Sequence, residues 1–208
     1  MAMCKSRSGL TLAASIQKRC FDLFFSLLGL LLLWWLILLA AFLAWIDTGQ
    51  NGFFSQCRVG RFGKPFKIIK IRTMRTVVNM DTSVTTANDC RITKLGRFFR
   101  KTKIDELPQL VNVLIGQMSF VGPRPDVPGF ADLLAGDDKS ILSIRPGITG
   151  PASIRYRNEE ELLASVEDPE SFNRNIIFPE KVRINREYVD NYTLLSDIKY
   201  IITTIINV

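Results

Sequence analysis

The sequence predicts an α+β protein that is predominantly α, with a membrane-embedded N-terminal helix, interfacial amphipathic helices and a small β-hairpin. Three observations support this fold: an apolar run near the N-terminus, two strand-like segments around a glycine-containing turn, and later stretches with apolar residues at helical spacing. The length of 208 residues leaves room for a membrane segment, residues 1–50, followed by one further domain, residues 51–208.

Residues 23–46 form the apolar run, which only Ser26 and Gly29 interrupt. As a straight helix this run would be about 36 Å long, against a hydrocarbon core of about 30 Å. Trp45 and Asp47 stand where a signal peptide would carry the small residues of a cleavage site. We therefore expect a membrane helix that is retained.

Basic residues lie on both sides of the apolar run. Lys18 and Arg19 precede it, and seven lysines and arginines follow it between residues 58 and 75. The positive-inside rule places both flanks in the cytoplasm, which a re-entrant helix satisfies and a single span does not. We prefer the re-entrant helix. An ordinary span, oriented by its stronger C-terminal charge, is the alternative.

The charge is divided along the chain. Residues 53–103 hold 13 lysines and arginines against two aspartates, whereas residues 105–208 hold 10 basic and 16 acidic side chains. A basic zone beside an apolar segment favours binding of anionic lipid and phosphates, and the acidic second half argues against nucleic acid.

The four cysteines lack zinc or disulfide spacing and predict reduced thiols. There is no histidine, so any chemistry must use carboxylates, amines or thiols.

A β-hairpin is predicted from residues 53–59 and 66–71, which are strand-like and flank a short turn containing glycine. Its basic side chains either face solvent or bind phosphate, and four of them together suggest phosphate: Arg58, Lys64, Lys70 and Arg72. Residues 76–88 are polar and short-sided, and they predict a loop.

The next stretch, RITKLGRFFRKTKI, predicts an amphipathic helix. Leu95, Phe98 and Phe99 share one helical face, with basic residues around them. Such a helix suits the surface of an anionic membrane, and packing on a protein core is the alternative. Residues 187–208 also carry apolar residues at helical spacing, which predicts a helix that packs on the body of the protein.

Two adjacent acids, Asp105 and Glu106, lie at the start of IDELPQLVNVLI. Because proline is tolerated only in the first turn of a helix, Pro108 predicts a helix with Asp105 as its N-cap. Both carboxylates would then lie beside free amides and the positive end of the helix dipole, where phosphate also binds. A plain capping role is the alternative.

Two arginines lie next to prolines. Arg124 lies between two prolines in VGPRPDV, and Arg145 precedes one in RPGITG. The prolines on either side of Arg124 stiffen its backbone, and an arginine on a rigid turn is suited to bidentate recognition of phosphate. Arg145 stands in a similar position before a proline and a glycine. For Arg124 the alternative is a structural ion pair with Asp126 or Asp132.

These motifs resemble the bacterial sugar transferases, the monotopic phosphoglycosyl transferases that start glycan assembly on polyprenyl phosphate. The resemblance runs from KRCFDLFFSLLGL to the final helix, and its most specific parts are FGKPFKIIKIRTM, RITKLGRFFRKTKIDELPQLVNVLIGQMSFVGPRP and RPGITG. It implies transfer of a phosphosugar from a UDP-sugar to polyprenyl (undecaprenyl) phosphate with release of UMP, the first membrane step of polysaccharide or glycoconjugate assembly. It also implies that residues 51–208 are a catalytic domain on the cytoplasmic face of the bacterial inner membrane.

The resemblance also implies roles for residues. Asp105 matches the family's nucleophile, which forms a covalent phosphosugar-aspartate, and Glu106 matches its partner. Mg²⁺ at Asp105 would neutralise the diphosphate. Five basic residues are expected to bind substrate phosphates: Arg58, Lys64, Arg72, Arg124 and Arg145. The expected partners are a UDP-sugar, polyprenyl phosphate and membrane lipids, with a homodimer possible and no nucleic acid. The acceptor phosphate is already ionised, so the chemistry does not require histidine.

Two positions depart from the family pattern. Trp35 stands where the family has a proline that breaks the membrane helix, and Pro151 follows RPGITG where many relatives carry an aromatic residue. Proline is the usual cause of a helix kink, so Trp35 bears directly on the re-entrant geometry. A membrane-anchored scaffold that binds lipid or nucleotide without turnover is the alternative function.

Overall fold

The computed structural model describes residues 9–76 and 89–206, so the loop predicted over residues 76–88 lies outside the described residues from residue 77 onward. The helices are α1 (Leu12–Thr48), α2 (Lys94–Lys101), α3 (Gln109–Leu114), α4 (Pro151–Arg155), α5 (Glu159–Ala164), α6 (Pro169–Phe172), α7 (Phe178–Asp190) and α8 (Leu194–Ile206). The strands are β1 (Phe53–Val59), β2 (Pro65–Ile71), β3 (Ser119–Val121) and β4 (Gly147–Thr149). The predominantly helical fold and the antiparallel hairpin β1–β2 are confirmed.

The helix α1 is longer than the apolar run that predicted it. It begins at Leu12 because the Thr11 hydroxyl accepts a hydrogen bond from the Ala14 amide, at 3.3 Å. It ends at Gly49, whose left-handed backbone (φ 69°) lets its amide bond to the Trp45 carbonyl. With a mean hydropathy of 2.7 in its apolar window, α1 is long and apolar enough to cross a membrane.

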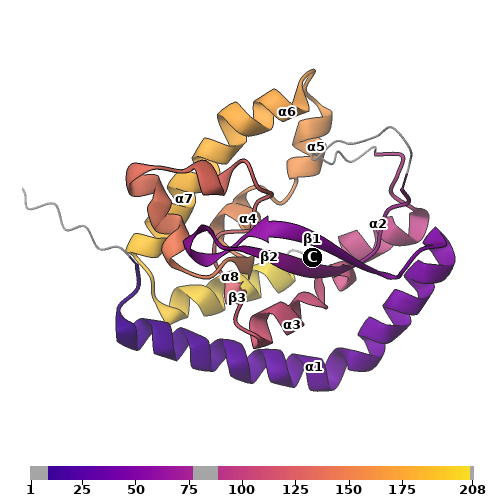
Figure 1. The fold of residues 1–208 in the computed structure, drawn as a ribbon, viewed down its shortest axis with the longest axis horizontal. Coiled ribbons are helices and arrows are strands. Elements are labelled where there is room, and N and C mark those ends of the chain that lie inside the picture. Colours follow the sequence, from indigo (N-terminus) through magenta and orange to yellow (C-terminus); the bar gives the residue numbers. More distant parts are fainter. Residues whose placement is uncertain (1–8, 77–88, 207–208) are drawn as a thin grey trace, which may run out of the picture.

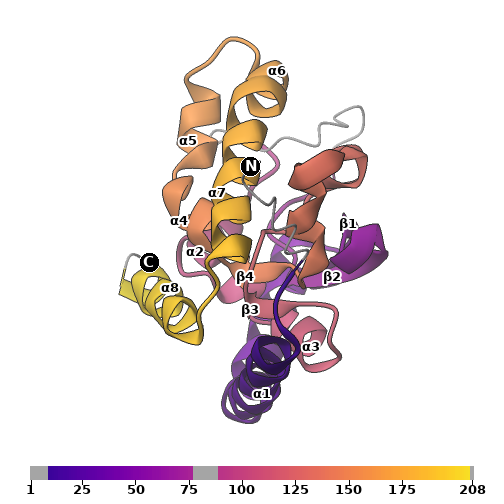
Figure 2. The same cartoon turned by 90° about the vertical axis from the view of Figure 1, so that its left-hand side faces the viewer.

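Midway along its length, α1 changes direction (Figure 1). Its backbone is α-helical throughout, and residues 12–48 contain no proline. The bend therefore forms with Trp35 in place of a proline. Figures 1 and 2 both show α1 along one side of the molecule, with α5 and α6 on the opposite side.

The N-terminal half of α1 packs on α3 and β3. Asp22 is buried and accepts hydrogen bonds from the Ser119 hydroxyl at 3.0 Å and the Phe120 amide at 3.1 Å. Gly29 allows close contact with α3, because a Cβ atom there would lie 3.1 Å from the Leu110 side chain. This half of the helix is thus fixed to the body by both polar and apolar contacts.

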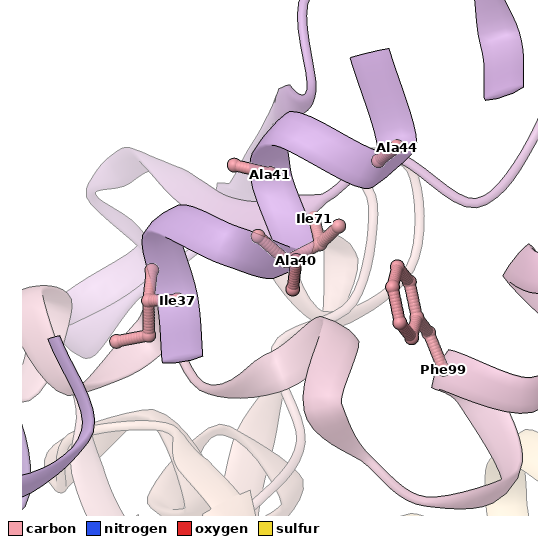
Figure 3. Packing of buried hydrophobic residues seen from close by; sticks show 6 residues of the cluster. All are labelled: Ile37, Ala40, Ala41, Ala44, Ile71 and Phe99. Carbon is pink, nitrogen blue, oxygen red and sulfur yellow. The ribbon is translucent and has the colours of Figure 1, made fainter. Parts of the chain in front are cut away.

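The C-terminal half of α1 packs on the same body through small residues. Four of its residues are buried with Ile71 of β2 and Phe99 of α2 (Figure 3): Ile37, Ala40, Ala41 and Ala44. The chain after the helix comes equally close, since a Cβ atom on Gly52 would lie 1.8 Å from the Ala41 carbonyl oxygen. Both halves of the bent helix therefore contact one body.

A buried ion pair joins the start of α1 to the C-terminal helices. Lys18 Nζ lies 2.5 Å from Asp197 Oδ2 of α8, and the Tyr188 hydroxyl of α7 donates to Asp197 Oδ1 at 2.6 Å. All three residues are buried. The contact connects segments about 180 residues apart, and it fixes α8 beside α1.

The hairpin is positioned over α3 by its second strand. Phe66 and Ile68 pack with Val113 and Met118. The Asn112 side chain accepts from the Ile69 amide at 3.1 Å and donates to the Lys67 carbonyl at 2.8 Å. These two hydrogen bonds satisfy backbone groups at the free edge of β2, where a neighbouring strand would otherwise pair. They also fix β2 relative to the chain around Glu106.

A short parallel pair, β3 and β4, was not expected from the sequence. Ser119 pairs with Gly147 and Val121 with Thr149. Glycine is required here because the backbones almost touch: a Cβ on Gly147 would lie 2.2 Å from the Gly122 nitrogen. The pairing brings the Arg124 turn and the RPGITG segment side by side.

The amphipathic segments divide between core and surface. In α2, Leu95 and Phe99 pack against the α1 cluster, whereas Phe98 is 55 % exposed, so the three residues do not share one environment. The predicted tail helix is two helices, α7 and α8, separated at residues 191–193. Tyr200 and Ile201 of α8 pack on the body as expected. Five large apolar residues of α8 are exposed: Leu195, Ile198, Ile202, Ile205 and Ile206.

Replacing Asp197 by asparagine should destabilise the protein by about 3 kcal/mol, because it leaves the buried Lys18 ammonium without a counter-charge. Denaturant unfolding of the detergent-solubilised protein measures this loss. Glu187→Gln is the matched control, since Glu187 forms an exposed pair with Arg183 and should change stability by less than about 1 kcal/mol. Equal losses in the two variants would contradict the structural role of the Lys18–Asp197 pair.

Candidate active site

Asp105 and Glu106 lie in a 3-10 turn (Ile104–Glu106) ahead of α3. This corrects the prediction that Asp105 is a helix N-cap. The left-handed backbone of Lys103 (φ 58°) begins the turn, and i to i−3 hydrogen bonds continue it. Pro108, which has no amide hydrogen, then precedes α3. Neither acid makes a side-chain capping bond, and both are buried.

Glu106 is held by two cations on one oxygen. Its Oε1 accepts from Lys70 Nζ of β2 at 2.9 Å and from an Arg124 guanidinium nitrogen at 2.5 Å. Burial alone would raise the pKa of Glu106, but the charges of Arg124 and Lys70 outweigh burial and hold that pKa well below its usual range. Glu106 is therefore an ionised, fixed anchor.

Asp105 differs from its neighbour in having no fixed partner. Its Oδ1 is buried and has no hydrogen-bond partner in the described part of the chain. Burial, followed by the negative charge of Glu106, raises the pKa of Asp105 to about 6. An unpartnered carboxylate oxygen of raised basicity beside fixed cations can serve as a nucleophile or as a metal ligand.

Arg124 is the predicted phosphate-binding residue that the structure places beside the acids. Its ion pair is with Glu106, and no described contact pairs it with Asp126 or Asp132. A second guanidinium nitrogen donates to the Ile148 carbonyl at 3.3 Å, which ties the Arg124 turn to β4. The side chain is 43 % exposed, so it is accessible from solvent.

Arg58 supports the Arg124 turn from β1. It donates to the Pro125 carbonyl at 3.3 Å and to the Gln56 side chain at 2.6 Å. Burial and the nearby charge of Arg124 lower the pKa of Arg58 to about 10. Two cations held close together against their mutual repulsion make this region strongly attractive to an anion.

The remaining predicted phosphate ligands lie elsewhere. Lys64 is exposed at the hairpin turn, six residues and about 20 Å along the strand from Lys70. Arg72 donates to the Asn51 carbonyl at 2.7 Å. Arg145 donates to the Gly116 carbonyl at 2.8 Å, beyond the C-terminal end of α3. Arg58 and Arg124 are thus the members of the predicted set whose charges act on Glu106.

Two further residues at the site were not assigned to it from the sequence. Lys70 was noted only within the basic hairpin, although strand alternation from Phe66 and Ile68 puts it on the inward face and could have selected it. Asp126 has a pKa raised to about 6 by burial, with Lys181 and Arg58 as opposing charges. Lys181 comes from a distant part of the chain, so no local signal predicts that proximity.

The donor set limits how a metal ion could bind. The described residues contain no group of three or more aspartate, glutamate, cysteine or histidine side chains that could hold one. Mg²⁺ commonly binds through one or two carboxylates together with substrate phosphates and water. The carboxylate of Asp105, which forms no ion pair among the described residues, fits that mode, whereas Glu106 Oε1 is already occupied by two cations.

Residues 13–208 match the family model of the bacterial sugar transferases. The match covers almost the whole chain, and the chain therefore belongs to this family. The resemblance inferred from the motifs is confirmed, as is the prediction that the chain is a transferase enzyme.

Several curated proteins are similar along most of this chain. The uncharacterized sugar transferase EpsL of Bacillus subtilis is 35 % identical over 190 residues, 91 % of this chain and 86 % of its own length. The exopolysaccharide production protein PSS of Rhizobium leguminosarum is 34 % identical over 200 residues, with 92 % and 94 % covered. The UDP-glucose:undecaprenyl-phosphate glucose-1-phosphate transferase of Escherichia coli is 35 % identical over 199 residues, 91 % of this chain. The chain spans only 39 % of that enzyme's length.

The Asp105 carboxyl should titrate near pH 6, and Glu106→Gln should lower its pKa. That substitution removes the neighbouring negative charge and frees Lys70 and Arg124 to interact with Asp105, so both effects favour the ionised form. The measurement is the pH dependence of the carboxyl ¹³C shift in aspartate-labelled protein, assigned by its loss in Asp105→Asn. Glu187→Gln is the control, and a wild-type titration near pH 4 would refute the prediction.

Proposed function

We propose that this protein is a phosphoglycosyl transferase that moves a sugar 1-phosphate from a UDP-sugar to polyprenyl phosphate and releases UMP. The family supports this class of reaction, and the substrates follow those named for the E. coli relative. The observation that carries the proposal is the contrast within the acid pair: Glu106 is fixed by two cations, while the adjacent Asp105 keeps a buried oxygen without a partner.

In the first step, Asp105 Oδ1 attacks the sugar-bearing phosphorus of the UDP-sugar. A bond forms between this oxygen and phosphorus, and the bond from phosphorus to the bridging oxygen breaks, so UMP leaves with the electron pair. The product on the enzyme is a phosphosugar-aspartate. We expect Arg124, whose side chain is partly exposed, and Arg58, which supports its turn, to stabilise the charge that develops on the diphosphate.

In the second step, an oxygen of polyprenyl phosphate attacks the same phosphorus. The bond to Asp105 breaks, the carboxylate is restored, and a polyprenyl diphosphate sugar is released. Both nucleophiles are oxyanions, so neither step needs a general base, which agrees with a chain that has no histidine. The raised pKa of Asp105, about 6, makes its carboxylate a stronger nucleophile while leaving it mostly ionised at neutral pH.

Mg²⁺ is the expected cofactor, and Asp105 is the residue placed to hold it together with diphosphate oxygens. The ion would supply charge neutralisation of the diphosphate and of the leaving UMP. Lys70 remains with Glu106 and keeps that carboxylate from competing as a second strong ligand.

The acceptor is a lipid, and α1 supports a membrane site for the reaction. A straight span would place its ends on opposite surfaces about 30 Å apart, where one body could not pack on both. The contacts of Asp22 with β3 and of Ala41 and Ala44 with Ile71 favour a re-entrant helix with both ends in the cytoplasm. We place the catalytic domain on the cytoplasmic face of the inner membrane.

Two exposed apolar surfaces fit the same orientation. Phe98 projects from the basic helix α2, and the outer face of α8 exposes Leu195 and Ile202. Basic and apolar side chains together on a helix suit the interface of an anionic membrane. We assign α2 and α8 to that interface, beside the membrane helix that they contact.

Incubation of the protein with a panel of UDP-sugars, polyprenyl phosphate and Mg²⁺ should release UMP with one or a few sugars. Asp105→Asn should lower this rate at least about 10³-fold, because it removes the nucleophile. The exposed Asp137→Asn is the matched control and should keep full activity. Full activity of the Asp105 variant would refute the covalent route. Binding of lipid and nucleotide by the wild type without UMP release would favour the scaffold function.

Single cysteines at positions 15 and 48, in a background without native cysteines, should both be labelled from the cytoplasmic side. These positions lie at the two ends of α1, and the re-entrant helix keeps both on one surface. A membrane-impermeant maleimide applied to oriented vesicles measures the sidedness, with a cysteine at exposed position 187 as the reference for the body. Labelling of positions 15 and 48 from opposite sides would establish a spanning helix.

A further inference from the structure

A second group of cations lies apart from the acid pair. It consists of Arg19 on α1, Arg61 in the hairpin turn and Arg145 before β4, which we call the three-arginine cluster. Its members come from three distant parts of the chain. The cluster lies beyond the C-terminal end of α3, whereas Asp105 lies in the turn ahead of its N-terminal end.

Each arginine of the cluster is held by backbone carbonyls. Arg19 donates to the last carbonyls of α3, those of Val113 at 2.7 Å and Leu114 at 2.8 Å. Arg145 donates to the Gly116 carbonyl at 2.8 Å. A Cβ atom on Gly116 would lie 3.3 Å from one nitrogen of Arg19 and 3.9 Å from Nε of Arg145, so the two guanidinium groups adjoin at this glycine.

Arg61 completes the cluster from the other side. Its Nε donates to the Ser143 carbonyl at 2.7 Å, and its guanidinium lies 4.5 Å from the centre of the Phe62 ring. Burial and the nearby charge of Arg145 lower the pKa of Arg61, which reports that the two cations repel each other. Capping of α3 explains the position of Arg19, but it does not explain why Arg61 lies beside Arg145.

The cluster carries charge that the described residues do not neutralise. None of its three arginines forms an ion pair within residues 9–76 and 89–206. Asp22 acts on Arg19 through its charge but forms no ion pair with it among the described residues; its Oδ1 accepts two hydrogen bonds from β3, and Lys18 is paired with Asp197. Each guanidinium has five N–H donors, and most remain unused.

The surroundings of the cluster are apolar as well as basic. Arg61 and Arg145 line an open hollow together with three residues of α1: Ser15, Lys18 and Asp22. Three large apolar side chains near the cluster in the sequence are exposed. They are Ile16, in the first turns of α1, at 55 %, Phe62, next to Arg61, at 61 %, and Ile115, next to Gly116, at 59 %. Cations beside exposed apolar side chains match the boundary between lipid headgroups and acyl chains, whereas a free phosphate would make no use of the apolar residues.

We propose that Arg19, Arg61 and Arg145 bind the phosphate of an anionic phospholipid, while Phe62 and Ile115 contact its acyl chains. The bound lipid would hold the hairpin turn and the β4 segment against the start of α1 at the membrane surface. This inference rests on the proposed membrane placement of α1 and is independent of the reaction at Asp105.

Photoactivatable phosphatidylglycerol, with the reactive group on an acyl chain, tests the site in nanodiscs of phosphatidylcholine that contain the full chain. Cross-links mapped by mass spectrometry should concentrate on the peptides that contain Phe62 and Ile115. Arg61→Gln and Arg145→Gln should each lower this capture about fivefold, as expected for one basic residue near an anionic surface. The readout needs no UDP-sugar, so it is separate from any failure to release UMP.

The control variant is Arg183→Gln, which removes the same charge from an exposed position on α7 and should not change the capture. Arg61→Lys keeps the charge and should keep most of the capture, which separates a binding role from a structural one. Unchanged capture in both glutamine variants would overturn the proposal, as would an equal loss in Arg183→Gln or loss in a folded Arg61→Lys.

Competition identifies the source of the phosphate. Unlabelled phosphatidylglycerol should displace the photoactivatable lipid from these peptides more effectively than polyprenyl phosphate or inorganic phosphate at the same concentration. Stronger displacement by polyprenyl phosphate would assign the cluster to the acceptor, and stronger displacement by inorganic phosphate would indicate a site for free phosphate. Either result would overturn the assignment to a membrane phospholipid.

Discussion

The site depends on the ion pairs that Glu106 Oε1 makes with Lys70 and Arg124. They join three separate segments: the second hairpin strand, the turn before α3, and the rigid loop after β3. A buried ion pair gives little net stability once the cost of removing both charges from water is counted, and loss of one partner leaves the other uncompensated. The arrangement therefore determines position more than stability. It fixes where cations stand beside Asp105 and keeps Glu106 ionised. Burial, followed by the repulsion from Glu106, raises the pKa of Asp105.

The same segments are fixed to α1 by contacts outside the site. The Asp22 side chain binds β3, and β3 pairs with β4. These two contacts fix the position of the Arg124 turn relative to α1. At the other end, Ala41 and Ala44 pack against Ile71, which follows Lys70 directly. The positions of Lys70 and Arg124, which hold Glu106, are thus both fixed relative to α1. In the proposed reaction the acceptor is a lipid phosphate, and the proposed membrane placement of α1 would set the height of the site above the membrane.

Local patterns predicted the elements whose signals lie within one segment. The hairpin strands follow from β-branched and aromatic residues on either side of Gly60 and Gly63, and α1 follows from its apolar run. Long-range pairings carried no such signal. Nothing local indicates that Gly122 and Gly147 are in contact, that Lys18 meets Asp197, or that Arg145 lies near Arg61 and away from Asp105. The N-cap prediction for Asp105 was wrong because the left-handed conformation of Lys103, which begins a separate 3-10 turn, is not encoded by a glycine or asparagine.

The structure divides the cations of one basic zone in the sequence between two clusters. Arg58 and Lys70 lie on the face of the hairpin that meets the acids, and Glu106 balances part of their charge. Arg61, only three residues after Arg58, lies beyond the strand in the turn, where strand alternation no longer applies and where Arg19 and Arg145 approach from other segments. A count of net charge along the chain does not distinguish these two groups of cations. The hairpin separates them, giving one group an internal carboxylate as its partner and leaving the other open to an anion from outside the protein.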